Sequence, residues 1–212
     1  MRTRAISIQD HARIAEAIRA AEAQTDGEIY CVVAHSSDSY FFPAAFMATI
    51  GMLAASLAIA CGLEMWWLSV RLSWFVLLQM LAVLCIVVIL WLVPALRIHL
   101  VPHGRRKMAA HANAVRQFLA RNVHLTEART GVLIFVSLAE RYAEVVADSG
   151  ISEHVGQHVW DGVVRDLTAE AASDRLAEGF IAAIGTVGTV LARHFPVSSD
   201  DINELDDHLV EI

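Results

Sequence analysis

Two long apolar segments, Phe41–Leu63 and Trp74–Leu96, interrupt a chain of 212 residues whose other parts have the composition of a soluble protein. Each segment exceeds the roughly 20 residues that an α-helix needs to cross the hydrocarbon core of a bilayer. Neither contains an Asp, Glu, Lys or Arg, so neither has the intramembrane charge that is typical of transporters and channels. The pattern predicts two transmembrane helices and argues against a transport function.

The short connector between the two segments, residues 64–73, predicts a helical hairpin that returns the chain to the side of the membrane from which it came. Positive charge indicates which side this is, because Lys and Arg next to membrane spans favour the cytoplasm. The connector carries one base, Arg71, whereas four bases follow the second segment: Arg97, Arg105, Arg106 and Lys107. We therefore expect a multi-pass protein of the inner (plasma) membrane with both termini in the cytoplasm. Membrane lipids with anionic headgroups are the expected partners of this basic cluster.

The parts of the chain outside the hairpin predict one α/β domain that the hairpin splits. A strand at Glu28–Ala34 precedes it, and strands at Gly131–Leu138 and Arg141–Ala147 follow it. The last two are joined by only two residues, which requires an antiparallel pair. Because a single short strand is not stable alone, we expect the first to join the later two in one sheet. Helical periodicity predicts helices at Ser7–Gln24, Arg105–Asn122, Val155–Ala171 and Asp174–His194.

These expectations divide the chain into four parts. Residues 1–40 hold the first helix and strand, 41–96 the membrane hairpin, 97–196 the remainder of the domain, and 197–212 an acidic tail. The tail has few apolar residues, so we expect a loosely held arm. The formal net charge of −7, with the bases concentrated in one segment, argues against a nucleic-acid partner. The acids of the tail are Asp200, Asp201, Glu204, Asp206 and Asp207.

Three stretches after the hairpin resemble the TPM domain family: Thr130–Ser137, Ala139–Arg141 and Val145–Ile151. The family includes thylakoid-lumen phosphatase-like proteins, photosystem repair factors and an accessory protein of nicotinic receptors. The resemblance implies a three-layer αβα sandwich. In this chain the sandwich would be interrupted after the first strand by a two-helix transmembrane hairpin, and this insertion is a departure from the secreted relatives. The likeness covers most of the chain outside the apolar segments and extends to Trp160, Glu178-Gly179-Phe180 and Phe195-Pro196.

The best candidate for a functional site is a group of acids and histidines that begins where the third predicted strand ends. His154 and His158 are four residues apart, so they share a face if a helix runs through both. Carboxylate ligands would suit Ca²⁺ or Mg²⁺, whereas the imidazoles would favour Zn²⁺. The plainer interpretation is a solvated helix surface, because the Glu of an HExxH motif is missing. The group consists of Asp148, Glu153, His154, His158 and Asp161.

Asp148 has two interpretations of its own. The sequence Asp148-Ser149-Gly150 after a strand is what a tight turn needs. Some TPM relatives are described as acid phosphatases or as binders of divalent cations, so the resemblance implies a nucleophile or metal ligand at Asp148 instead. Arg141 and Arg165 would then supply charge for a phosphate. No P-loop, G-x-S-x-G or C-x5-R motif accompanies these residues.

Two functions follow from these observations. The first is a membrane-proximal binding or accessory module that faces the cytoplasm and has a protein partner at the membrane. The second is a divalent-metal-dependent acid phosphatase that acts at the membrane surface. The missing catalytic motif favours the first.

Overall fold

The computed structural model describes residues 6–67, 70–126, 129–198 and 205–212. It divides into two compact units. The first, which we call the sheet domain, combines Met1–Ser37 with Lys107–Ile212, and the second, the helical unit, is Asp38–Arg106. Chain segments on both sides of the helical unit therefore build the sheet domain.

Four strands in the order β3-β2-β1-β4 form one mixed sheet. β1 (Glu28–Ala34) and β2 (Gly131–Ser137) are parallel neighbours over their full lengths, and β2 pairs antiparallel with β3 (Tyr142–Ala147). Every residue of β1 and β2 is buried, which agrees with their almost unbroken apolar sequences. The expectation that the first strand joins the two later strands in one sheet is confirmed.

The end of the acidic tail is part of the sheet, so the expectation of a loosely held arm is wrong there. β4 (Leu209–Glu211) pairs in parallel with β1, and the Ile212 N–H donates to the Val33 carbonyl oxygen at 2.9 Å. Leu209 is only 3% exposed and belongs to the core. A strand of three residues next to acids leaves no readable alternation in the sequence. The tail acids Asp200, Asp201 and Glu204 lie outside the described residues.

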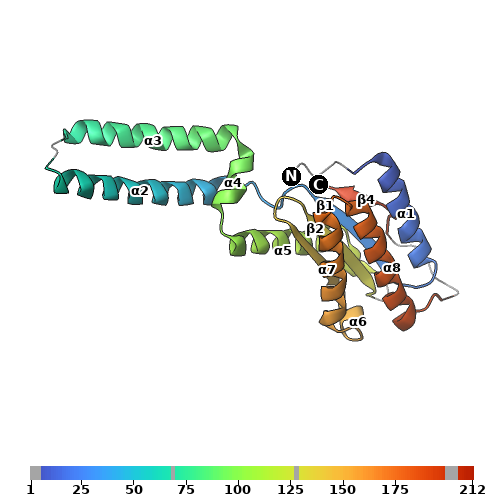
Figure 1. Cartoon of the computed structure of the whole chain (residues 1–212). Helices are drawn as coiled ribbons and strands as arrows, with labels where there is room; N and C mark the ends of the chain where they lie inside the picture. The colour runs from blue at the N-terminus through green and yellow to red at the C-terminus, as the bar shows by residue number, and fades with distance from the viewer. Residues whose placement is uncertain (1–5, 68–69, 127–128, 199–204) are drawn as a thin grey trace. The chain divides into compact units, whose positions relative to one another are not determined.

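Helices cover both faces of the sheet (Figure 1). α1 (Ile8–Glu22), α7 (Gln157–Ala172) and α8 (Leu176–His194) contribute to the apolar core on one face. The periodicity that predicted these helices arises from their buried stripes. The largest fully buried side chains of this core include Ile14, Ile18, Leu167, Phe180, Ile184 and Leu191.

A second, smaller core lies on the opposite face of the sheet. α5 (His103–Ala120) supplies Ala114 and Phe118, which pack with β-strand residues such as Val32 and Phe135. The short 3-10 helix η1 (Val123–Leu125) follows α5 and adds the fully buried Val123. Successive side chains of a strand point to opposite faces of the sheet, so they alternately contact α5 on one face and α1, α7 and α8 on the other.

Three predicted helices have boundaries that the structure corrects. The helix expected from Val155 begins at Gln157 as α7, because Gly156 is its N-cap, and a separate short helix, α6 (Ser149–Ser152), precedes it. The helix expected from Asp174 begins at Leu176, because Asp174 has a positive φ of 57°. The second apolar helix, α3 (Leu72–Leu92), ends before Pro94, which begins a separate helix, α4 (Pro94–Leu100), because proline lacks the N–H that α3 would need to continue.

A polar network ties the exit of β1 to the turn between β2 and β3. The Ser37 N–H donates to Glu140 Oε1 at 3.0 Å, and the hydroxyls of Ser37 and Ser137 are 2.9 Å apart. Ser137 also donates to the Glu140 carboxylate, and Asn113 of α5 lies 3.5 Å from Ser37 Oγ. Ser137, Glu140 and Asn113 are buried, so these bonds satisfy polar groups that would otherwise be costly.

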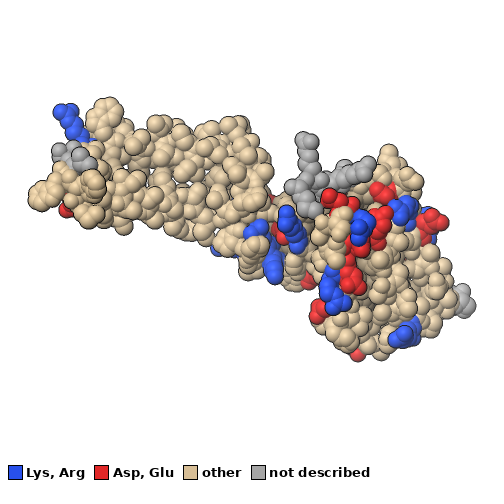
Figure 2. Space-filling view, in the orientation of Figure 1, with Lys and Arg blue, Asp and Glu red and all other residues tan. Residues whose placement is uncertain are grey.

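The two long helices of the helical unit present an almost uncharged surface on the face that Figure 2 shows. α2 (Phe41–Met65) and α3 lie side by side and expose most of their large apolar side chains. Within the part of the chain that the structure describes, three helices, α2, α3 and α8, are long and apolar enough to cross a membrane. In the most apolar window of α8, 50% of the residues are buried, against 6% in α2 and in α3. The apolar character of α8 is therefore explained by the core of the sheet domain.

Arg97 of α4 holds the carboxyl end of α3. Its Nε donates to the Leu90 carbonyl oxygen at 2.8 Å and its Nη2 to that of Trp91 at 3.2 Å. A cation at a helix carboxyl end is favourable, because the carbonyl groups there lack partners within the helix. The guanidinium carbon also lies 5.3 Å from the centre of the Phe41 ring.

Glu22, at the end of α1, makes the stability of the sheet domain depend on pH. Burial, and then the nearby carboxylates of Glu28 and Asp207, raise the pKa of Glu22 from 4.5 to about 9, although a hydrogen bond from the Ile29 N–H opposes them. The folded state thus keeps this carboxyl protonated at pH 8, whereas the unfolded chain ionises it. Stability conferred at low pH is therefore lost progressively as the pH rises from about 4.5 towards 9.

We expect Glu22→Gln to raise the free energy of unfolding at pH 8 by about 1–2 kcal/mol, because glutamine keeps the acceptor and removes the cost of protonation. The gain should vanish at pH 4. Chemical unfolding followed by circular dichroism at both pH values measures it, with Glu16→Gln at an exposed position of α1 as the matched control. Equal stability of wild type and Glu22→Gln at pH 8 would show that Glu22 is ionised in the fold.

Candidate binding groove along strand β3

β3 is an outer strand of the sheet, and one of its edges has no neighbouring strand among the described residues. The Asp148 N–H donates to the Gly131 carbonyl oxygen at 3.0 Å, which fixes the alternation of the antiparallel ladder. Backbone groups of the even residues of β3 bond to β2, so those of Ala143, Val145 and Ala147 point to the open edge. Within the described chain, the Ser152 hydroxyl, 3.4 Å from the Ala147 carbonyl oxygen, is the only partner found for them.

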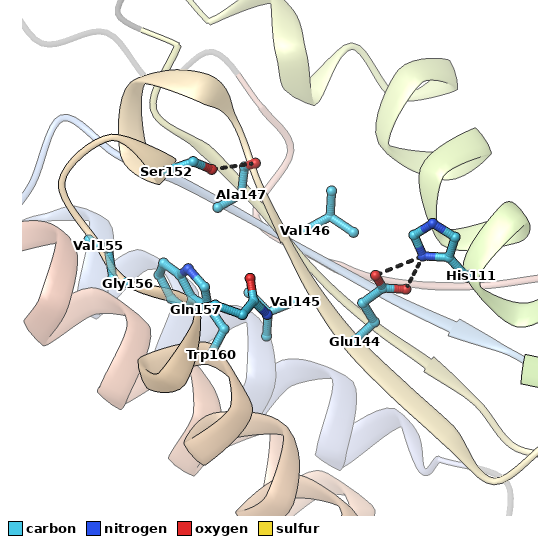
Figure 3. A pocket seen from close by; sticks show the side chains of 10 residues that line it. All are labelled: His111, Glu144, Val145, Val146, Ala147, Ser152, Val155, Gly156, Gln157 and Trp160. Atoms are coloured by element: carbon cyan, nitrogen blue, oxygen red, sulfur yellow. Dashed lines mark hydrogen bonds and ion pairs between the residues drawn. The ribbon is translucent and has the colours of Figure 1, made fainter.

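A pocket of about 350 Å³ lies beside this edge, between β3 and the turn that joins α6 to α7 (Figure 3). Val155 and Trp160, which are 6% and 3% exposed, form its apolar wall. Gly156 and the exposed Gln157, at the start of α7, form its rim. We call the open edge of β3 together with this pocket the β3 groove.

One carboxylate, that of Glu144, lines the β3 groove from the α5 side. His111 Nδ1 lies 2.8 Å from Glu144 Oε1 and 3.0 Å from Oε2, and the Tyr142 hydroxyl donates to Oε2 at 3.0 Å. Burial, with the neighbouring Glu144 charge, raises the pKa of Tyr142 to about 12. The tyrosine therefore stays a hydrogen-bond donor at physiological pH and holds the carboxylate in place.

Asp148, the first residue of the candidate metal group, is a helix cap. Its Oδ1 accepts hydrogen bonds from the Ser149 N–H at 2.5 Å and from the Ser149 hydroxyl at 3.1 Å, and the residue is the N-cap of α6. Its Oδ2 is buried without a hydrogen-bond partner among the described residues. The turn interpretation of Asp148 thus accounts for one carboxylate oxygen and leaves the other without an explanation.

The two histidines of the group do not share a helix face, because α7 begins only after His154. His154 Nδ1 lies 3.0 Å from the Gly150 carbonyl oxygen, and its ring packs edge-on against Phe195 with 5.6 Å between ring centres. His158 lies in the first turn of α7, where its ring covers Gly156. The condition for a shared face, a helix that runs through both residues, is therefore not met.

The remaining acids of the group are also engaged in local contacts. Glu153 is the C-cap of α6, and Asp161 accepts a hydrogen bond from the Gln157 side chain at 3.2 Å. Among the residues that the structure describes, no three His, Cys, Asp or Glu side chains are close enough to hold a metal ion. Arg165, a candidate phosphate ligand, is exposed, and its Nε lies 3.4 Å from Oδ1 of the neighbouring Asp166. Arg141 lies in the turn between β2 and β3.

The candidate metal group predicted from the sequence thus lies near the β3 groove, but none of its residues lines the pocket. The available signal was the mixed polar and apolar sequence of Tyr142–Ala147, which is typical of an outer strand and agrees with its mixed burial in the structure. His111 and Glu144 are 33 positions apart in sequence, so only the fold brings them together.

Comparison with known proteins gives one informative likeness. No protein-family model and no curated protein matches the chain. A solved structure with a similar fold is the NMR structure of the BA42 protein from the psychrophilic bacterium Bizionia argentinensis. The two chains are 17% identical, the alignment covers 100% of this chain and 99% of the other, and the TM-score is 0.61. At this level of identity the likeness concerns the fold alone.

Proposed function

We propose that this chain is an integral membrane protein in which α2 and α3 form a two-helix transmembrane hairpin. Both helices expose large apolar side chains along their lengths, and such a surface is unfavourable in water but suits a bilayer. Trp66, Trp67 and Trp74 near the connector suit the interfacial region of a membrane. The half-buried α8 is assigned to the sheet domain and not to the membrane.

The sheet domain faces the cytoplasm in this proposal, and the protein lies in the inner (plasma) membrane with both termini on that side. The exposed Arg105 and Lys107, with Arg106 between them, follow the second span, whereas the connector offers only Arg71. The same cations would attract anionic lipid headgroups.

The architecture that best fits the sheet domain is a TPM-like three-layer αβα sandwich. Two observations support it: the apolar cores on the two faces of one sheet, and the sequence resemblance that begins at Thr130–Ser137. The α2–α3 hairpin would then be an insertion between β1 and the rest of the domain.

The function we propose for this domain is that of a binding or accessory module for a protein partner at the membrane. The observation that carries this proposal is the β3 groove, an open strand edge beside a pocket that has an apolar wall and is lined by the Glu144 carboxylate. Such a surface suits recognition of another chain better than chemistry. β1 ends at Ala34 and α2 begins at Phe41, so the short connection favours partners that are themselves close to the membrane.

Site-specific photo-crosslinking in cells tests this function. A photoreactive benzoylphenylalanine at Gln157, on the rim of the β3 groove, is expected to give one protein adduct of defined mass. The same group at Thr186, an exposed position of α8, is the control and should not give that adduct. Indistinguishable adducts from both positions, or none from Gln157, would contradict the assignment of the groove as a binding surface.

A phosphatase dependent on divalent metal is the second candidate, and Asp148 is the observation that favours it. A buried carboxylate oxygen without a hydrogen-bond partner is a position where a cation would be stabilising. The purified full chain, tested with Mg²⁺, Ca²⁺ and Zn²⁺ and a generic phosphate ester, separates the two functions. Phosphate release that Asp148→Asn abolishes would establish the enzyme, whereas an inactive protein that binds no ion supports the binding module.

A further inference from the structure

We propose that the β3 groove binds an extended segment of a partner protein, which pairs with β3 as an additional strand and places basic side chains beside Glu144. This inference rests on the proposed binding function and names its ligand. An open strand edge is a template for such pairing, because its main-chain donors and acceptors are already aligned.

The backbone of β3 provides the pairing groups. Ala143, Val145 and Ala147 alternate along the strand, and the N–H and C=O groups of each point away from β2. An incoming strand needs this spacing, because only every second residue of a strand faces a given neighbour. The Ser152 hydroxyl, which now contacts the Ala147 carbonyl oxygen, belongs to an exposed residue at the end of α6 and is a weak competitor at 3.4 Å.

The two sides of β3 define what the incoming side chains would meet. Val145 belongs to the core shared with α7, whereas Val146 packs against the core shared with α5. A partner residue opposite Val145 would therefore direct its side chain towards the apolar wall of Val155 and Trp160. Its neighbours would direct theirs to the α5 side, where Glu144 lies. The groove thus selects an alternation of apolar and basic residues.

Charge also distinguishes this ligand from a second copy of the chain. β3 itself, Tyr142–Ala147, contains Glu144 and no Lys or Arg, so a copy of β3 would bring no cation to that carboxylate. The exposed acids Glu153 and Asp161, near the same rim, add to the negative field. A basic strand is therefore the complementary partner.

The test measures binding of a fluorescent peptide to the full chain in nanodiscs of zwitterionic lipid, which avoids attraction of the peptide to anionic headgroups. The probe is a peptide in which lysine and valine alternate. Its length of about six residues is typical of a strand. We expect Glu144→Lys to raise the dissociation constant about fivefold or more. That factor corresponds to the upper end of the free energy of one cross-strand charge pair, and the substitution also adds repulsion. Glu16→Lys, the same charge change at an exposed position of α1, should leave affinity unchanged.

Two further measurements identify the mode of binding. A peptide with alternate backbone nitrogens methylated keeps its side chains but loses the donors of one edge, so it should no longer bind. Gln157→Trp, at an exposed position, should block the pocket and weaken binding of the unmodified peptide, whereas Thr186→Trp should not.

Three results would overturn the inference: no binding of the lysine-valine peptide, equal binding of the methylated peptide, or equal affinity of Glu144→Lys and Glu16→Lys. The proposed binding function would survive any of them if Gln157 still crosslinks to a protein in cells. Loss of that crosslink together with peptide binding would overturn both.

Discussion

Replacing Gly131 with alanine is expected to prevent stable folding of the sheet domain, although the change adds a single carbon atom. An added Cβ would lie 2.1 Å from the Val123 carbonyl oxygen and 2.8 Å from Val123 Cγ1. The first of these atoms is backbone, so it cannot rotate away, and Val123 is fully buried. Either β2 or η1 must shift within a packed core, at a cost of about 3 kcal/mol or more.

Such a loss is a large part of the roughly 5–15 kcal/mol that stabilises a typical domain. Thermal unfolding of the purified variants, followed by circular dichroism, measures it. Gly185→Ala in α8 is the matched control, because its added Cβ meets nothing within 4 Å. There the helix propensity of alanine should leave stability unchanged or raise it by about 1 kcal/mol. Gly131→Ala with the stability of wild type would contradict the close contact between β2 and η1.

Removing the helical unit is expected to yield a water-soluble sheet domain that folds. All members of both apolar cores lie outside residues 38–106. Ser37 Oγ is 3.5 Å from Asn113 Nδ2, and Lys107 lies six positions before Asn113, about 9 Å along the α5 axis. A glycine-serine linker of about eight residues can therefore join Ser37 to Lys107 without strain.

Size-exclusion chromatography and cooperative thermal unfolding measure the outcome for this shortened protein. Joining Ser37 directly to Lys107 is the control, since it holds their Cα atoms about 3.8 Å apart and should disrupt the network around Ser37 and Glu140. Aggregation of the variant with the glycine-serine linker would show that the sheet domain depends on the helical unit for folding.

The segments whose secondary structure could be predicted from this sequence were those with long, uniform patterns. The apolar runs predicted α2 and α3, and the short bounded runs at Glu28–Ala34 and Gly131–Leu138 predicted two central strands with an error of at most one residue. Burial on both faces gives such strands their unbroken apolar character, so local sequence is sufficient to find them.

The parts that sequence could not predict depend on contacts between distant segments. β4 exists because β1 offers it an edge, and its three residues carry no pattern of their own. α6 ends at Ser152 and α7 begins only at Gln157, so no single helix carries both His154 and His158. The β3 groove requires the ladder alternation set by Gly131 and Asp148, which no local pattern contains.

Cysteine labelling of intact cells tests most directly whether a membrane hairpin is inserted into a domain that faces the cytoplasm. Val70→Cys places a thiol at an exposed position of the connector, and Thr186→Cys places one on the exposed side of α8. A membrane-impermeant maleimide should label Val70→Cys in intact cells and Thr186→Cys only after permeabilisation. The wild type, with its own Cys31, Cys61 and Cys85, gives the background. Labelling of Thr186→Cys in intact cells would contradict the account.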